Sequence, residues 1–228
     1  MTLKDILNQV LSECGFSESP QFFNAQNSDI NQLIALAQRS ARVLSKHDWQ
    51  ALRKTASITL TSAEYYDLPS DFRQTISDTM WMAGRADKPD FPASDTSWGY
   101  VKARGINNSL HYSLRLEGNQ FAVLSPVVGE VVSYDYLSNN PIIDIDTITS
   151  KPRWAKDTDT WLLDDDLIQM DLIWRFKKLK GLQDWQIDHQ DFQNHFRSLQ
   201  GTDSGSQSIN TISNGTHSSE PIADLWVS

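Results

Sequence analysis

The chain has 228 residues, of which 39% are hydrophobic, so it is long enough to bury one substantial core or two small ones. Its 29 acidic and 20 basic residues give a formal net charge of −9, which argues against a surface that grips nucleic acid by neutralising phosphates. The single cysteine, Cys14, excludes an intrachain disulfide and a thiolate-based zinc site, and we interpret it as a buried structural thiol.

Two amphipathic helices are expected at the start of the chain. Apolar residues recur at steps of three and four over residues 3–14, which predicts a helix that Gly15 terminates. The same spacing returns over residues 28–47, directly after the favourable cap residue Asn27.

The residue pattern changes at Thr55. From there small polar and apolar residues alternate as in a half-buried strand, so residues 55–68 are expected to be extended. Proline suits the first turn of a helix, and Pro69 therefore predicts a third helix over residues 70–82.

A β and loop region is expected to follow. Glycine and proline make residues 84–110 a long loop. Strands over 112–116, 121–124 and 131–137 are predicted to form a small antiparallel meander, so that the β and loop insertion covers about 55–68 and 84–140.

Two antiparallel helices are predicted near the end of the ordered region. A helix is predicted over residues 164–180. Three aspartates, 164–166, lie at its positive amino end and three lysines, 177, 178 and 180, lie at its negative carboxyl end, as the helix dipole favours. A second helix is expected over residues 184–200, with Gly201 as its terminator.

Residues 201–228 are rich in Gly, Ser, Thr and Asn and contain no Lys or Arg, so they cannot build a core. They form either a tail that orders on a partner or a disordered end, and the apolar 225–227 favours the partner. The predicted fold class is α+β and mainly α: an antiparallel helical bundle over residues 1–200 with an inserted small antiparallel β region, followed by a disordered or extended C-terminal tail.

No set of residues predicts catalysis, a cofactor or a metal. His189 and His195 are six residues apart and lie about 240° apart around a helix, whereas a zinc pair needs a spacing of four. The aspartates at 157, 159 and 164–166 lack the pattern of a calcium loop, and no nucleophile elbow, phosphate-binding glycine loop or His-Glu-x-x-His motif occurs.

The chain resembles the head-to-tail adaptor, or head-completion, proteins of tailed and mainly short-tailed bacteriophages. The similarity covers about the first 200 residues, and the order and spacing of its motifs make it specific. The motifs are 44–52 (LSKHDWQAL), 66–72 (YDLPSDF), 78–81 (DTMW), 115–120 (RLEGNQ), 124–126 (LSP), 134–140 (YDYLSNN) and 172–182 (LIWRFKKLKGL).

The resemblance implies a structural virion protein that forms a ring of twelve copies between the portal protein and the tail nozzle or lower tail proteins. Such a ring closes the head after packaging and continues a channel through which double-stranded DNA passes without specific binding. The resemblance also implies that residues 201–228 dock on the portal, where the apolar candidates are Ile209, Ile212, Ile222, Leu225 and Trp226.

The long loop is the second candidate contact region, because exposed loops commonly carry binding. Its apolar residues Phe91, Trp98 and Tyr100 are candidates for a subunit or tail interface. We expect a protein that is made in the host cytoplasm, acts in the virion and has no membrane partner, since no apolar run approaches the ~20 residues of a membrane span.

Two other functions are retained as alternatives. A virion-associated peptidoglycan hydrolase would need two carboxylates across a sugar cleft, and the sequence identifies no such pair. A DNA-binding packaging accessory would need a basic stripe, and basic residues cluster only over 175–180.

Overall fold

The computed structural model describes residues 1–83, 95–104, 113–124 and 126–205 of the chain. Within them lie five α-helices and one short 3₁₀ helix: α1 (Leu3–Glu13), α2 (Ser28–Leu44), η1 (Gln50–Leu52), α3 (Asp95–Arg104), α4 (Asp165–Lys180) and α5 (Trp185–Gly205). The strands of the same residues are β1 (Arg53–Thr59), β2 (Tyr65–Asp67), β3 (Phe72–Thr75), β4 (Trp81–Met82), β5 (Ser113–Glu117), β6 (Gln120–Leu124), β7 (Val131–Ser138), β8 (Ile142–Asp144), β9 (Thr149–Lys151) and β10 (Thr160–Trp161).

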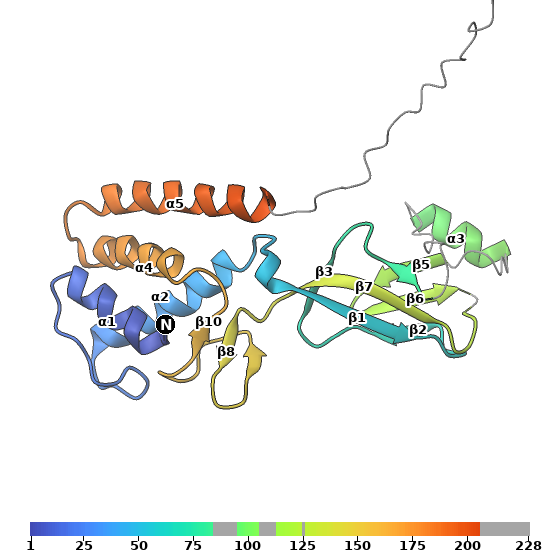
Figure 1. Cartoon of the computed structure of the whole chain (residues 1–228), viewed down its shortest axis with the longest axis horizontal. Coiled ribbons are helices and arrows are strands. Elements are labelled where there is room, and N and C mark those ends of the chain that lie inside the picture. The colour runs from blue at the N-terminus through green and yellow to red at the C-terminus, as the bar shows by residue number, and fades with distance from the viewer. Residues whose placement is uncertain (84–94, 105–112, 125, 206–228) are drawn as a thin grey trace, which may run out of the picture.

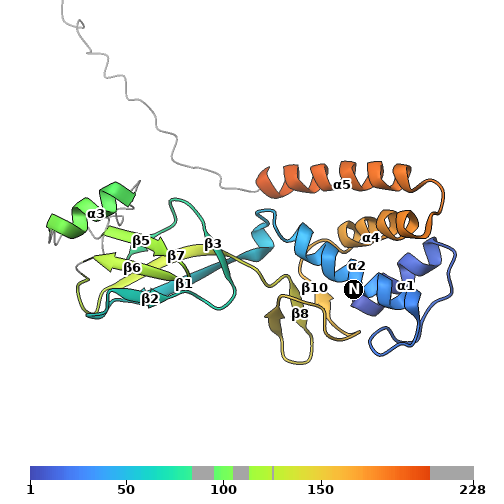
Figure 2. The ribbon, with the colours of Figure 1, turned by 180° about the vertical axis from the view of Figure 1, so that it is seen from behind.

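Two lobes lie one after the other along the long axis of the molecule (Figure 1). The helical lobe contains α1, α2, α4 and α5 together with a small antiparallel sheet of order β10–β8–β9. The β lobe contains the remaining strands and α3. Each lobe has its own buried apolar cluster, and the view from behind shows the two lobes side by side, with the chain passing from one to the other through the start of β1 and through the link between β7 and β8 (Figure 2).

Helices α1 and α4 begin and end within a residue of the predicted bounds, whereas α2 ends at Leu44 and not at the predicted residue 47. Thr2 and Asp5 form a capping box at α1, with the Asp5 backbone N–H 3.3 Å from Thr2 Oγ1. Asp164 Oδ1 accepts from the backbone N–H of Leu167 at 2.9 Å, and Gly181 ends α4 at φ +68°, a left-handed conformation that glycine adopts without strain. Among the described residues, no helix is long and apolar enough to cross a bilayer.

Gly201 does not end the last helix, as the sequence predicted, because α5 continues to Gly205. Contacts beyond Gly201 hold the extra turn: the Gln50 amide donates to the carbonyl of Asp203 at 2.7 Å, and the Gln50 backbone N–H donates to its carboxylate at 3.1 Å. Tertiary contacts of this kind outweigh the ~1 kcal/mol by which glycine disfavours a helix interior.

The β lobe is built around β7. One sheet has the order β1–β7–β3, with β4 also paired to β7, and a second sheet has the order β2–β6–β5. The predicted meander is therefore wrong in its pairing: β5 and β6 form the expected hairpin, but β6 pairs with β2, and β7 belongs to the other sheet. The core between the sheets includes Phe121 and Tyr134, whose rings meet edge to face at 5.1 Å.

The predicted helix over residues 70–82 is also wrong. Phe72, Ile76 and Met80 are spaced by four, but the segment forms β3 and β4 instead. Pro69 accepts a turn hydrogen bond from the Phe72 backbone N–H at 2.9 Å, and Thr75 then pairs with Tyr136 of β7. The open edge of β7 supplies backbone partners that a helix here would leave unused, which overrides a short-range pattern.

These differences correct the predicted fold class. The described residues contain ten strands in three antiparallel sheets beside five α-helices, so the chain is α+β but is not a mainly α helical bundle with a small insertion. The region predicted as a long loop also contains α3.

The two lobes are braced at their junction by the carboxylate of Asp71. Lys54 of β1 donates to it at 2.7 Å, the Tyr136 hydroxyl donates at 2.9 Å and the Ser138 hydroxyl at 2.8 Å. Lys54 also reaches Ser150 of β9 in the helical lobe, at 2.9 Å. The junction is therefore a hydrogen-bonded joint between the two cores.

Candidate interaction site

The hairpin of β8 and β9 carries two apolar side chains that face solvent. Ile145 is 52% exposed and Ile148 is 84% exposed, and both lie in the turn that joins the strands. Single exposed apolar residues are ordinary on protein surfaces, but two isoleucines in one four-residue turn form a local apolar tip. We call residues 145–148 the hairpin tip.

The backbone at the hairpin tip is strained. Ile148 has φ +53°, in the left-handed region that a β-branched side chain rarely adopts. Its backbone N–H donates to the Asp144 carbonyl at 2.8 Å, which holds the turn in this shape. Strain of this kind persists only where the surroundings enforce it and is concentrated at functional sites, so the tip is a candidate contact point.

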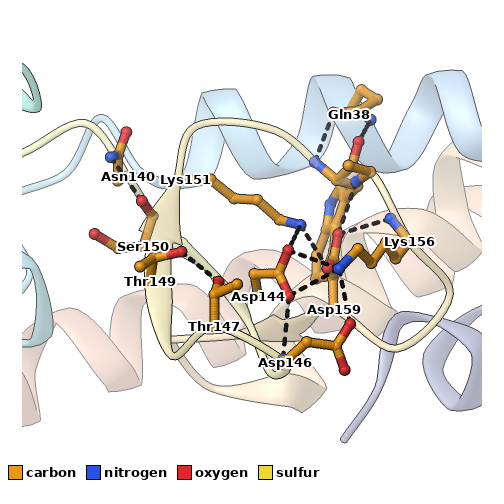
Figure 3. Close-up of polar contacts among 12 residues, drawn as sticks. Gln38, Asn140, Asp144, Asp146, Thr147, Thr149, Ser150, Lys151, Lys156 and Asp159 are labelled. Atoms are coloured by element: carbon orange, nitrogen blue, oxygen red, sulfur yellow. Dashed lines mark hydrogen bonds and ion pairs between the residues drawn. The ribbon is translucent and has the colours of Figure 1, made fainter.

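An ion-pair network lies directly beneath the hairpin tip (Figure 3). Lys156 contacts Asp146 at 2.7 Å and Asp144 at 3.1 Å, and Lys151 contacts Asp144 at 3.2 Å and Asp159 at 2.6 Å. Because the two lysines share Asp144, the hairpin and the loop that precedes β10 are fixed against each other.

The most buried member of this network is Asp159, whose side chain is fully shielded from solvent. Besides Lys151, it accepts hydrogen bonds from the backbone N–H groups of Ala155 and Lys156 at 2.7 and 2.8 Å. A buried charge is tolerated when it is paired and its lone pairs are hydrogen-bonded, and both conditions hold here.

The network also shifts pKa values in the direction that keeps its groups charged. The hydrogen bond from Lys156 is the main reason that the pKa of Asp144 lies below its ordinary value, and Lys151 adds to the effect. Hydrogen bonds to Asp146 and Asp144 in turn raise the pKa of Lys156. The ion pairs therefore persist throughout the neutral range.

The loop that precedes β10 also connects the hairpin to helices α1 and α2 by hydrogen bonds. The backbone N–H of Leu3 donates to the Asp159 carbonyl at 2.7 Å. Gln38 of α2 forms a two-way contact with the Trp154 backbone, donating to its carbonyl at 2.6 Å and accepting from its N–H at 3.2 Å. Helices α1 and α2 therefore hold the hairpin, which makes the tip a rigid projection.

The hairpin tip was not among the elements predicted from the sequence. A signal was present: 142–149 is a short run rich in β-branched Ile and Thr in which apolar and polar residues partly alternate, which is typical of a short hairpin. No glycine marks the turn, and a left-handed isoleucine is not an expected turn residue.

The predicted interface residues of the long loop are separated by the structure. Trp98 is buried, with the Arg115 guanidinium 6.0 Å from its ring centre, whereas Tyr100 is exposed. Phe91 lies outside the described residues, as do the predicted portal contacts Ile209, Ile212, Ile222, Leu225 and Trp226. Their roles stay predictions.

The two histidines of α5 have separate structural contacts. His195 lies 3.2 Å from Asp164, and His189 packs against the Trp174 ring at 4.4 Å. Within the part of the chain that the structure describes, no group of three or more His, Cys, Asp or Glu residues could hold a metal ion. Burial raises the pKa of the Cys14 thiol to about 11, so at neutral pH it is protonated.

Comparison with known proteins identifies the family. The model of the family described as SU10 adaptor protein matches residues 1–213, and no curated protein matches the chain. The match confirms the resemblance to phage head-tail adaptors. It suggests a structural protein of the virion, rather than an enzyme, that contacts other head and tail proteins of the phage. The chain belongs to the SU10 adaptor protein family.

Proposed function

We propose that copies of this chain form a ring between the portal and the tail, close the head after packaging and continue the channel for the genome. In this proposal residues 201–228 dock on the portal, and the ring contains about twelve copies, the number that the resemblance implies. Double-stranded DNA passes through without being bound specifically.

The observation that carries this proposal is the hairpin tip, which the ion-pair network and helices α1 and α2 hold in place. Ile145 and Ile148 are presented to solvent by a turn that ion pairs and two helices hold in a strained shape. The exposed parts of these side chains add nothing to the packing of their own chain, whereas a preformed apolar projection binds with little loss of conformational entropy. The arrangement fits a protein whose task is to join other proteins.

The charge of the chain supports the channel. A net charge of −9 per copy makes a ring of copies strongly negative, and like charges keep DNA from adhering to the wall. Salt screens this repulsion beyond about 8 Å, so the genome can pass near the wall without being excluded from the channel.

The test is reconstitution of the junction from the full chain, purified portal rings and purified tail proteins of the same phage. Analytical ultracentrifugation would measure the mass of each mixture. We expect the chain to add to portal rings in a fixed ratio, and a chain truncated after Gly205, where α5 ends, to lose portal binding while it stays folded.

The same assay tests the hairpin tip. The double variant Ile145→Ser with Ile148→Ser is expected to lose binding either to portal or to tail proteins and to retain the other. Val128→Ser, which changes an exposed apolar residue in the β lobe, is the matched control and is expected to bind both. Failure of the unaltered chain to bind either partner at any salt concentration would overturn the proposed function.

A further inference from the structure

The helical lobe has two charged surfaces of opposite sign, an acidic groove and a basic face. The acidic groove has a volume of about 340 Å³, lies between α1, α4 and α5, and is lined by Glu13, Asp166, Gln169, Asp188 and Asp191 among others. No lysine or arginine lines it. Because the groove is open to solvent and carries several carboxylates, it is suited to positively charged side chains.

Within the described residues, only one of these carboxylates forms an ion pair. Asp188 is paired with Lys177 at 2.8 Å. Glu13, Asp166 and Asp191 are exposed and, within the described residues, form no ion pair. Three carboxylates without an ion pair of their own around one groove repel each other, and a positive partner would relieve that repulsion.

Gln169 is an independent indication that the acidic groove can bind a hydrogen-bond donor. Its side chain is only 7% exposed, and its amide nitrogen donates to Glu13 at 2.7 Å. Its Oε1 has no hydrogen-bond partner in the part of the chain that the structure describes. A buried acceptor without a donor destabilises a structure, so a small rotation of the amide toward an incoming N–H group would be favourable.

The basic face lies on α2, α4 and the segment after β9. It consists of two adjoining grooves, of about 330 and 450 Å³, that share Arg39. Arg42 and Arg153 line the first groove and Lys178 lines the second. All four side chains are exposed and, in the described ranges, none pairs with a carboxylate, whereas Arg175 is committed to buried Asp171 at 2.7 Å.

The two charged regions lie on opposite sides of α4. Residues 166, 169, 170 and 173 face the acidic groove, and residues 174, 175, 178 and 179 face the basic one. At about 100° per residue, the mean directions of these two sets differ by roughly 160°. A copy of the chain can therefore present its acidic groove to one neighbour and its basic face to another.

We propose that the acidic groove of one copy receives Arg39, Arg42 and Lys178 from the basic face of the next copy. The inference rests on the proposed ring and names the surfaces that build it. Each contact joins two different surfaces, so the same contact repeats around a closed ring. Because copies of net charge −9 repel one another elsewhere, this one complementary pair of surfaces also sets their orientation.

The first test is charge reversal in the full chain. One variant carries Arg39→Glu with Arg42→Glu, and the other carries Asp166→Lys with Asp191→Lys. Each is expected to weaken self-association by at least about tenfold in sedimentation experiments at low salt. An equimolar mixture of the two variants, or one chain with all four changes, is expected to restore association, because opposite charges again face each other.

Matched controls separate this contact from a general effect of charge. Arg197→Glu and Glu18→Lys reverse exposed charges that line neither groove and should leave association unchanged. Added salt should weaken association of the unaltered chain. If the control reversals weaken association as much as the paired ones, or if the mixture does not recover, the proposed surfaces are wrong.

Cross-linking gives a second readout that is independent of affinity. In a Cys14→Ser background, a chain with both Arg39→Cys and Asp191→Cys is expected to form a ladder of disulfide-linked multimers when diamide is added, free or on portal rings. Either cysteine alone should give at most dimers.

Portal-bound copies without a ladder would refute these surfaces and leave the adaptor function standing, whereas a ladder without portal binding would refute the adaptor function alone. Binding of double-stranded DNA by the basic face, abolished by the Arg39 and Arg42 reversals while self-association persists, would also overturn the proposal.

Discussion

The helical lobe and the β lobe are held together in different ways. The helical lobe contains buried charges that are matched within the chain: Asp159 with Lys151, and Asp171 with Arg175, where both carboxylates are fully shielded from solvent. In the described part of the β lobe, Lys54 pairs with the buried carboxylate of Asp71 at the joint, and the other ion pairs lie nearer the surface, as Lys102 with Glu64 does. Its stability rests on an apolar core between two antiparallel sheets.

This difference in stabilisation agrees with the candidate contact surfaces that each lobe exposes. Buried ion pairs contribute little net stability but fix geometry, because a misplaced partner leaves a charge uncompensated. The helical lobe bears the hairpin tip, the acidic groove and the basic face, which need fixed positions. Away from the joint, the described part of the β lobe has exposed aromatic residues such as Tyr65 and Tyr100 and ion pairs that lie near the surface, so this end can adjust more easily to a partner.

The largest expected effect tests whether the lobes unfold separately. Phe121→Ala should destabilise the β lobe by about 4 kcal/mol, because a fully buried ring is replaced by a cavity beside Tyr134. Hydrogen exchange read by mass spectrometry should show lost protection in β6 and β7, while α4 keeps its protection. Phe176→Ala is the matched change in the helical core and should give the reverse pattern. Equal loss of protection in both lobes from either change would show a single cooperative unit.

The next effect tests the role of buried charge. Asp159→Ala should lower the free energy of unfolding of the helical lobe by about 3 kcal/mol, because it leaves Lys151 and two backbone N–H groups without their main acceptor. Asp146→Ala removes an exposed carboxylate from the same network and should change stability far less. Urea denaturation followed by circular dichroism measures both, and similar losses would mean that burial does not matter here.

The joint between the lobes should respond to pH. Burial alone would raise the pKa of Asp71, but hydrogen bonds from Lys54, Ser138 and Tyr136 outweigh it and hold the pKa below its ordinary value. The ionised carboxylate therefore stabilises the folded chain fully above the unfolded pKa of about 3.9, and this contribution is lost as the pH falls through the lower folded pKa.

Asp71→Asn should accordingly cost about 2 kcal/mol at pH 7, since it removes charge-assisted hydrogen bonds. The difference between this variant and the unaltered chain should shrink as the pH falls below about 4. Thermal unfolding between pH 7 and pH 3 measures it, and a difference that is constant over this range would exclude Asp71 as the titrating group.

The elements that the sequence predicted correctly are those that local rules determine. Asn27 and Asp164 mark the starts of α2 and α4 because capping groups act within one helical turn. The strands of the β5–β6 hairpin were also predicted, from alternation around a glycine turn with Gly118 at φ +60°.

The errors arose where partners distant in the sequence decide the structure. Residues 72–75 became a strand because β7, about 60 residues away, offered an edge. The grooves around α4 followed the same rule, because they combine segments that are separated by more than 100 residues. Hydrophobic periodicity predicts which face of a helix is buried but not which other element covers it.

The smallest expected effect concerns the hairpin tip. There a substitution should raise the stability of the chain, whereas the other changes lower it. Ile148→Gly should stabilise the chain by about 1 kcal/mol: release of left-handed strain exceeds the entropic cost of glycine, and a side chain that is 84% exposed buries little. Ile145 lies on the same turn without a positive φ, so Ile145→Gly should destabilise slightly instead. If the tip is a docking point, Ile148→Gly should also weaken binding to portal or tail proteins. A gain in melting temperature together with a loss of binding would mean that the strained isoleucine is kept for its partner, whereas unchanged binding would reduce it to a tolerated local irregularity.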